Sequence, residues 1–149
     1  MSASRLIYVG AEDWLHPHWR EAFYPDGLPD DWQLSYYNTR FQTVYLPAAC
    51  WQTATAADWV QWLADTQPGF RFLLEPGTLP PPCDARIIVA TPAWCDAHLW
   101  WIDAFPDLRE LARQASARAA HGEPLFVISR SGDLEKMEQA MILSEVLGY

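Results

Sequence analysis

Lysine is almost absent from this chain, whose only lysine is Lys136. Ten lysine and arginine residues stand against nineteen aspartate and glutamate residues, which gives a formal net charge of −9. Binding to DNA or RNA depends on clustered basic residues that displace counterions from phosphates. The charge balance therefore argues against nucleic acid as a partner.

Cysteine is also scarce, and the three cysteines, Cys50, Cys83 and Cys95, contain no Cys-X-X-Cys pair. An odd number at such wide spacing argues against a disulfide framework and against a thiolate zinc site. No apolar run approaches the ~20 residues of a membrane helix, and the first ten residues lack the apolar core of a signal peptide. We therefore expect a soluble cytoplasmic protein with no membrane partner, no bound metal and no cofactor.

What the chain does contain is a regular alternation of strand and helix patterns, with nine tryptophans spread among them. Strands are predicted at 6–9, 43–46, 70–74, 85–90 and 125–129. Helical patterns begin near Asp30, Thr55, Thr91, Leu108 and Asp133, and Pro106 ends or kinks the one that starts at Thr91. Between the third and fourth strands, the polyproline-like segment 79–83 takes the place of a helix.

This alternation predicts an α/β protein: one domain over residues 1–149, with a mostly parallel five-stranded sheet and crossover helices. We favour an open, flavodoxin-like three-layer sandwich. Functional residues of such sheets collect at the carboxyl ends of the strands. Glu12, Asp13 and Glu75 are predicted to lie there, and converging carboxylates can bind Mg²⁺ or share a proton as acid and base.

Six further residues are candidates for binding a ligand at the same edge: Trp14, His16, Trp51, Thr91, Arg130 and Ser131. Arg130 and Ser131 run from a strand into a helix N-terminus, where backbone N–H groups favour anions. Trp100 and Trp101 are consecutive on a predicted helix, so their side chains diverge by about 100°. At least one of them is expected at the surface, which favours a homodimer formed through an aromatic face.

The first half of the chain also carries a family pattern. It consists of Tyr8-Val9-Gly10, Trp14, Trp19-Arg20, the run from Phe23 to Pro29 (FYPDGLP), Asp31-Trp32, Tyr36-Tyr37, Phe41 and Thr43-Val44, followed by Gly69-Phe70 and Phe72. Over about residues 6–76 the chain thus resembles the YecE-like family of uncharacterised bacterial proteins. The resemblance implies the start of a TIM-like (βα) barrel. A complete barrel takes about 250 residues, so the alternative to the open sandwich is a truncated barrel.

The two arrangements differ in strand order. The second strand beside the third indicates the barrel, whereas the first strand between them indicates the open sheet. The chain also departs from the family pattern at the strand ends. Gly10-Ala11-Glu12-Asp13-Trp14 stands where the family typically has Gly-Thr-Ser-Gly-Trp, and Glu75 stands where it has a lysine. A positive site would thereby become acidic.

Two functions follow from these observations. The first is a non-catalytic module for protein interaction or small-ligand binding, related to the YecE-like proteins, because no catalytic motif accompanies the candidate residues. The alternative is a hydrolase-type enzyme with an acidic, Mg²⁺-dependent site at Glu12, Asp13 and Glu75.

Overall fold

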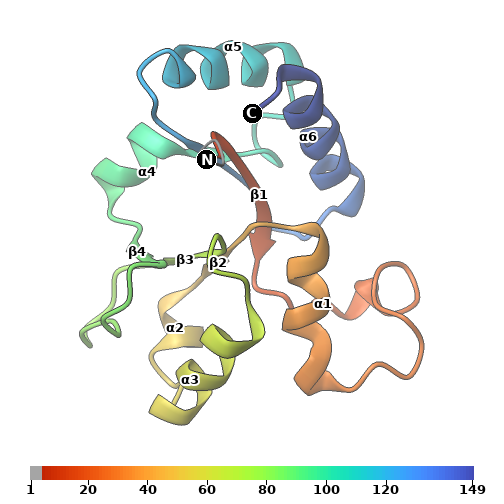
Figure 1. Cartoon of the computed structure of the whole chain (residues 1–149), viewed down its shortest axis with the longest axis vertical. Coiled ribbons are helices and arrows are strands. Elements are labelled where there is room, and N and C mark those ends of the chain that lie inside the picture. The colour runs from red at the N-terminus through yellow and green to blue at the C-terminus, as the bar shows by residue number, and fades with distance from the viewer. Residues whose placement is uncertain (1–4) are drawn as a thin grey trace.

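The computed structural model describes residues 5–149 and shows one parallel sheet of six strands (Figure 1). The strands are β1 (Ile7–Glu12), β2 (Thr43–Leu46), β3 (Arg71–Leu74), β4 (Ile87–Val89), β5 (Leu99–Trp101) and β6 (Leu125–Ser129). They lie in the order β4-β3-β2-β1-β6-β5. The sheet curls into a half-barrel, with helices between the strands. The predicted α/β class, with parallel strands and crossover helices, is confirmed.

The helices are α1 (Gln33–Arg40), α2 (Ala48–Trp51), α3 (Ala56–Asp65), α4 (Pro92–His98), α5 (Leu108–Ala119) and α6 (Leu134–Leu147). Two short 3₁₀ turns, η1 (Pro17–Trp19) and η2 (Asp30–Trp32), precede α1. α3 begins at the predicted place with a capping box, in which Thr55 and Asp58 each accept a hydrogen bond from the other's backbone N–H. As expected, no helix connects β3 to β4.

The strand order decides between the two arrangements considered from the sequence. β2 pairs with β3 on one side and with β1 on the other. In the flavodoxin-like order β1 would separate β2 from β3, so that order is not the one observed. The sequential order of β1 to β4 is the order of a barrel, and the truncated barrel is the better description of this sheet.

The sixth strand, β5, corrects the predicted helix that was to begin at Thr91 and carry both Trp100 and Trp101. That helix ends at His98, and the next three residues pair with β6. Leucine and tryptophan suit a half-buried pleated edge better than an extension of a short helix. Side chains alternate across a strand. Trp101 therefore packs on the inner face against Tyr45, whereas Trp100 lies on the outer side.

The outer, convex face of the sheet holds the larger core. Val9, Val44, Phe72 and Val127 pack there against the apolar sides of α1, α3, α5 and α6. Gly10 also fits this close packing, because a Cβ at that position would lie 1.9 Å from the carbonyl oxygen of Thr43. The order of apolar residues in each strand thus places the main core between sheet and helices.

The inner face is covered by α4. The chain passes from β4 at one edge of the sheet to β5 at the other through this seven-residue helix, which is about 10 Å long. Trp94 and Cys95 of α4 pack with Leu73 and Phe126 of the inner face. The Trp94 and Phe126 ring centroids are 5.2 Å apart. The helix therefore closes the open side of the half-barrel, where Figure 1 shows it apart from the other helices.

The aromatic stretch after β1 forms a cap on the sheet edge. Trp19 is fully buried, stacks on Tyr37 and donates its indole N–H to the carbonyl oxygen of Gly132 at 2.7 Å. Gly132 has a φ of 68°, and a Cβ there would come within 2.9 Å of the His16 ring.

Within residues 5–149, no helix is both long and apolar enough to cross a membrane.

Candidate functional site

The carboxyl edge of the sheet is centred on Arg130, which follows β6. Its guanidinium carbon lies 3.9 Å from the ring centroid of Trp101 and 6.0 Å from that of Tyr45. Its Nη1 donates to Oε1 of Glu12 at 3.0 Å. Trp101 and Tyr45 meet edge to face, with ring centroids 5.1 Å apart. The positive charge is thus held between an aromatic face and a carboxylate, and both interactions stabilise it.

Three groups that could act as nucleophiles, Tyr45, Cys50 and Cys95, are held in their protonated forms. Burial raises the pKa of Tyr45 to about 12, and the nearby Glu75 carboxylate acts in the same direction. Burial also raises the pKa of the Cys50 thiol, with Asp13 contributing, and it raises the pKa of the Cys95 thiol. A thiol must lose its proton to become a strong nucleophile. Neither cysteine is set up for that at neutral pH.

The three carboxylates predicted to converge have separate partners. Glu12 is part of β1 and is paired with Arg130. Asp13, in the left-handed region with a φ of 64°, accepts from the backbone N–H of Trp14 at 2.6 Å. Glu75 accepts from the backbone N–H of Ala48 at 2.9 Å. Within residues 5–149, no three His, Cys, Asp or Glu side chains are grouped so that they could hold a metal ion. The Mg²⁺ site of the alternative, hydrolase-type function is therefore not assembled in this part of the chain.

The predicted anion site at the start of α6 is occupied by a side chain of the protein itself. Asp103, after β5, accepts hydrogen bonds from the Ser131 backbone N–H and from the Ser129 hydroxyl, both at 2.8 Å. Burial by itself would raise the pKa of Asp103, but these hydrogen bonds outweigh it and the pKa is lowered. Asp133, the N-cap of α6, donates its backbone N–H to the Ser129 hydroxyl. The site suits an anion, and Asp103 is that anion.

Two of the predicted ligand-binding tryptophans are packed within the protein. Trp14 is buried and meets Trp62 edge to face, with ring centroids 5.1 Å apart. Trp51 is buried as well, and its indole N–H donates to the backbone oxygen of Glu75 at 2.8 Å. Each ring secures a loop that follows a strand.

Thr91 and His16 also make local contacts. The Thr91 hydroxyl is the N-cap of α4 and accepts from the backbone N–H of Trp94 at 3.2 Å. His16 places its Nε2 2.5 Å from the backbone oxygen of Glu12, and its ring lies beside that of Trp19. Of the predicted site residues, Glu12 and Arg130 are joined by a side-chain ion pair.

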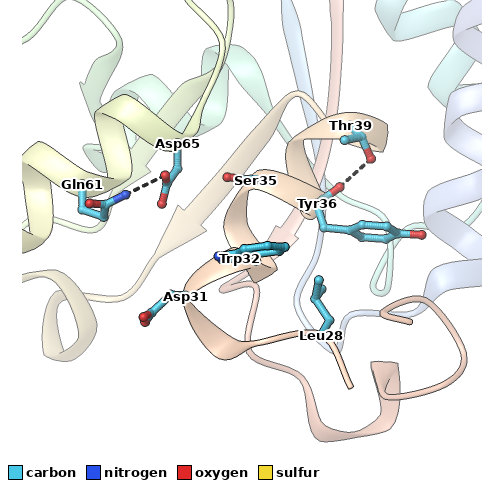
Figure 2. A pocket seen from close by; sticks show the side chains of 8 residues that line it. All are labelled: Leu28, Asp31, Trp32, Ser35, Tyr36, Thr39, Gln61 and Asp65. Carbon is cyan, nitrogen blue, oxygen red and sulfur yellow. Dashed lines mark hydrogen bonds between the residues drawn. The ribbon is translucent and has the colours of Figure 1, made fainter. Parts of the chain in front are cut away.

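A cavity of about 680 Å³ lies away from this edge, between α1 and α3 (Figure 2). Its lining residues are Leu28, Asp31, Trp32, Ser35, Tyr36, Thr39, Gln61 and Asp65. The Trp32 side chain is 63% exposed, although tryptophan is usually largely buried. Figure 2 shows its indole between the Leu28 side chain and the α3 residues Gln61 and Asp65.

The charge of this cavity is negative. Two carboxylates, Asp31 and Asp65, line it, and its lining contains no lysine, arginine or histidine. Asp65 accepts a hydrogen bond from Gln61 at 2.7 Å, which fixes one of its oxygens. It is also the last residue of α3, where the partial negative charge of a helix C-terminus adds to its own. The cavity therefore combines an open aromatic face with negative potential.

Several of these residues were not predicted as site residues from the sequence, although the sequence contained signals for some of them. Tyr45 lies two residues after Thr43 on a predicted strand, so the two side chains point to the same face of the sheet. Trp101 was hidden by its assignment to a helix. Trp32 appeared in the sequence as part of the family pattern, whereas Asp103 and Asp65 carried no signal. The packing of α1 beside α3 brings Trp32 and Asp65 together.

These features define an α/β protein with a parallel half-barrel sheet and an aromatic-rich carboxyl edge. Residues 8–75 match the model of a family described as "Protein of unknown function DUF72", which is the family of the YecE-like proteins. The match runs from β1 to the end of β3, where the sequential strand order is also barrel-like. The first half of the chain is therefore similar to these proteins, as its residue pattern predicted. Neither a search of curated proteins nor a search of solved structures found a match.

Proposed function

We propose that this chain is a non-catalytic module that binds a small organic cation against Trp32. The observation that carries the proposal is the 63% exposed indole of Trp32 in a cavity of about 680 Å³ that is lined by two carboxylates and no basic side chain. This volume falls within the range of about 300–1,000 Å³ typical of ligand pockets.

A cation fits this lining better than a neutral or anionic ligand does. Tryptophan offers the most favourable aromatic face for an ammonium group. Asp31 and Asp65 supply the opposite charge, while Leu28 provides an apolar wall for the methyl or methylene groups of the ligand. Asp30 and Asp31 lie in the first turn of η2, so the positive end of the η2–α1 segment is met by carboxylates.

The chemistry of the carboxyl edge supports a role without catalysis. Glu12, Asp13 and Glu75, the carboxylates of the hydrolase alternative, each have a partner within the chain. The pKa values of Cys50 and Cys95 are raised, which works against covalent catalysis. We place the module in a reducing cytoplasm, and the free state of all three cysteines supports this.

The test is a titration with tetramethylammonium chloride, followed through the indole N–H resonances in two-dimensional NMR. We expect a saturable shift of the Trp32 signal. Trp32→Ala should abolish binding, and Asp65→Asn should weaken it several-fold because one of the two carboxylate charges is removed. Asp96→Asn, an exposed carboxylate change on α4, is the matched control and should bind as wild type does.

Neopentyl alcohol, a neutral compound of similar shape, distinguishes a cation site from an apolar one. Equal binding of both compounds would overturn the choice of ligand class. The hydrolase alternative is tested separately with chromogenic ester and phosphate substrates. Turnover that is lost in Glu12→Gln but kept in Trp32→Ala would show that the carboxyl edge is catalytic, and the non-catalytic assignment would then be wrong.

A further inference from the structure

We infer a second binding site, for a phosphate group, at the amino end of the half-barrel. A cavity of about 500 Å³ opens there, and its lining includes Arg5, Arg40 and Arg71. The whole chain has only ten lysine and arginine residues against nineteen acidic ones. Three of those ten basic residues thus meet at one cavity, and no carboxylate is among its lining residues.

The Arg71 side chain is held in place by the backbone next to it. Arg71 is the first residue of β3, the strand that pairs in parallel with β2. Its Nη1 donates to the backbone oxygens of Pro68 and Phe70, at 3.0 and 3.1 Å. These bonds orient the guanidinium while its other nitrogens stay available. A guanidinium held in this way presents a planar pair of donors, which matches two oxygens of a phosphate.

Arg40 and Arg5 add charge from two other elements. Arg40 ends α1 and pairs with Glu138 through Nε and Nη2, so its Nη1 remains for a ligand. Arg5 is exposed, and the next residue, Leu6, is tied to the fold by backbone hydrogen bonds to Tyr149 and Leu125. Within residues 5–149, Glu138 is the one acidic side chain paired with these three arginines, so basic side chains predominate at this cavity of an acidic protein.

The polar lining supports a small, strongly hydrogen-bonded anion rather than an apolar ligand. Asn38 bridges two segments of the rim: its amide N–H donates to the Phe41 carbonyl and its oxygen accepts from the Gln67 backbone N–H. This pairing fixes the rim and leaves the exposed Gln67 side chain as a further donor. A long polyanion is disfavoured by the net charge of −9, which repels phosphate chains beyond the cavity.

The experiment is a titration of the full chain with inorganic phosphate at constant ionic strength, observed through the backbone amide resonances. We expect saturable shifts at Gly69, Phe70 and Arg71. Because a charge-assisted hydrogen bond to phosphate is lost, Arg71→Gln should weaken binding by about tenfold. Arg113→Gln, which removes an exposed arginine of α5 paired only with its own helix, is the matched control and should bind as wild type does.

A second variant keeps the test sharp if Arg71→Gln folds poorly, since Arg71 is half-buried. Arg5→Gln changes an exposed residue and should weaken binding about threefold. If glycerol phosphate binds as tightly as inorganic phosphate does, the site is assigned to phosphate esters. If glycerol phosphate does not bind, the site is assigned to the free phosphate ion. The proposal is overturned if sodium chloride alone produces the same shifts, or if both arginine variants bind phosphate as wild type does. Neither result bears on the site at Trp32.

Discussion

Arg130 shows how one side chain can join four strands of a curled sheet. It follows β6, stacks on Trp101 of β5, pairs with Glu12 of β1 and lies within 6.0 Å of the Tyr45 ring of β2. The same guanidinium thus links the ends of strands from both halves of the sheet.

Removal of Arg130 should therefore cost stability. For Arg130→Ala we expect a loss of about 1 kcal/mol in the free energy of unfolding, because a cation–π contact and a partly buried ion pair disappear together. Arg20→Ala is the control: its 3.8 Å pair with Asp30 has side chains 71% and 77% exposed, and little change should follow. Urea denaturation followed by circular dichroism measures both. Equal losses in the two variants would contradict the role given to Arg130.

Tyr45 predicts how stability changes at alkaline pH. Its pKa is about 12 in the folded protein, against about 10 for tyrosine in an unfolded chain. The unfolded state therefore loses this proton first, and stability should fall as pH rises from about 10 through 12. Tyr45→Phe removes this contribution, so its stability should decline less steeply over the same range. Urea unfolding at stepped pH tests this, and parallel curves for the two proteins would show that Tyr45 does not contribute.

At the residue scale, the sequence predicted where side chains lie on the sheet more readily than which partners they contact. Glu12 and Arg130 were placed correctly at strand ends, since chain alternation alone sets where a strand stops. Their pairing with each other was not predictable, because it depends on β6 lying next to β1. Trp32 was part of the family pattern, but its exposure was not predictable, because it follows from how α1 packs beside α3.

Among the elements, α4 has the most unusual position. The other helices of at least eight residues contribute to the core on the convex face, whereas α4 packs on the inner face and spans its open side. Trp94 and Cys95 give it an apolar side, while Ala93, Asp96 and Ala97 face outward. The helix does for this short sheet what further strands do in a closed barrel, because it keeps water from the inner residues.

Truncation of Trp94 tests this role. The side chain is half-buried against Phe126, so Trp94→Ala should lower the free energy of unfolding by roughly 2–3 kcal/mol, somewhat below the usual cost for a fully buried tryptophan. Ala93→Ser, an exposed change on the same helix, should stay within about 0.5 kcal/mol of wild type. Faster amide exchange along β5 in the first variant would accompany the loss. Comparable stability of both variants would mean that α4 is not needed to cover the inner face.

Most elements could be predicted because each has a local signal. β-Branched and aromatic runs predicted β2, β3, β4 and β6, and the helical pattern beginning near Thr55 predicted α3. β5 could not be found in this way. Its three residues follow α4 without a turn, and they are a strand only because the edge of β6 is available to pair with them.

At the scale of the whole molecule, the order of the strands in the sheet is a feature that local sequence patterns do not determine. Alternation of strands and helices fixes neither which strands are neighbours nor whether a sheet closes. The family resemblance over the first half pointed to a barrel, and the observed sequence of β1 to β4 agrees with it. The second half then departs from a full barrel, because α4 carries the chain directly to the opposite edge.

The predicted homodimer also concerns the whole molecule. Of the two tryptophans proposed for its interface, the structure favours one. Trp101 is engaged with Arg130 on the inner face, so Trp100 is the member of the pair that is suited to meet another chain. Its indole N–H donates to the Phe105 carbonyl at 2.9 Å, and the two rings lie side by side with centroids 5.8 Å apart. Phe105 is 59% exposed, which leaves an aromatic pair on the outer surface.

Light scattering coupled to size-exclusion chromatography should therefore give twice the chain mass of 17.0 kDa. Phe105→Ser should return the protein to the mass of one chain, because the apolar contact at the centre of the interface is lost. Val146→Ser, which changes another exposed apolar residue, on α6, should leave the dimer intact. A wild-type mass of one chain would end the dimer hypothesis, whereas a dimer that survives Phe105→Ser would require an interface elsewhere on the molecule.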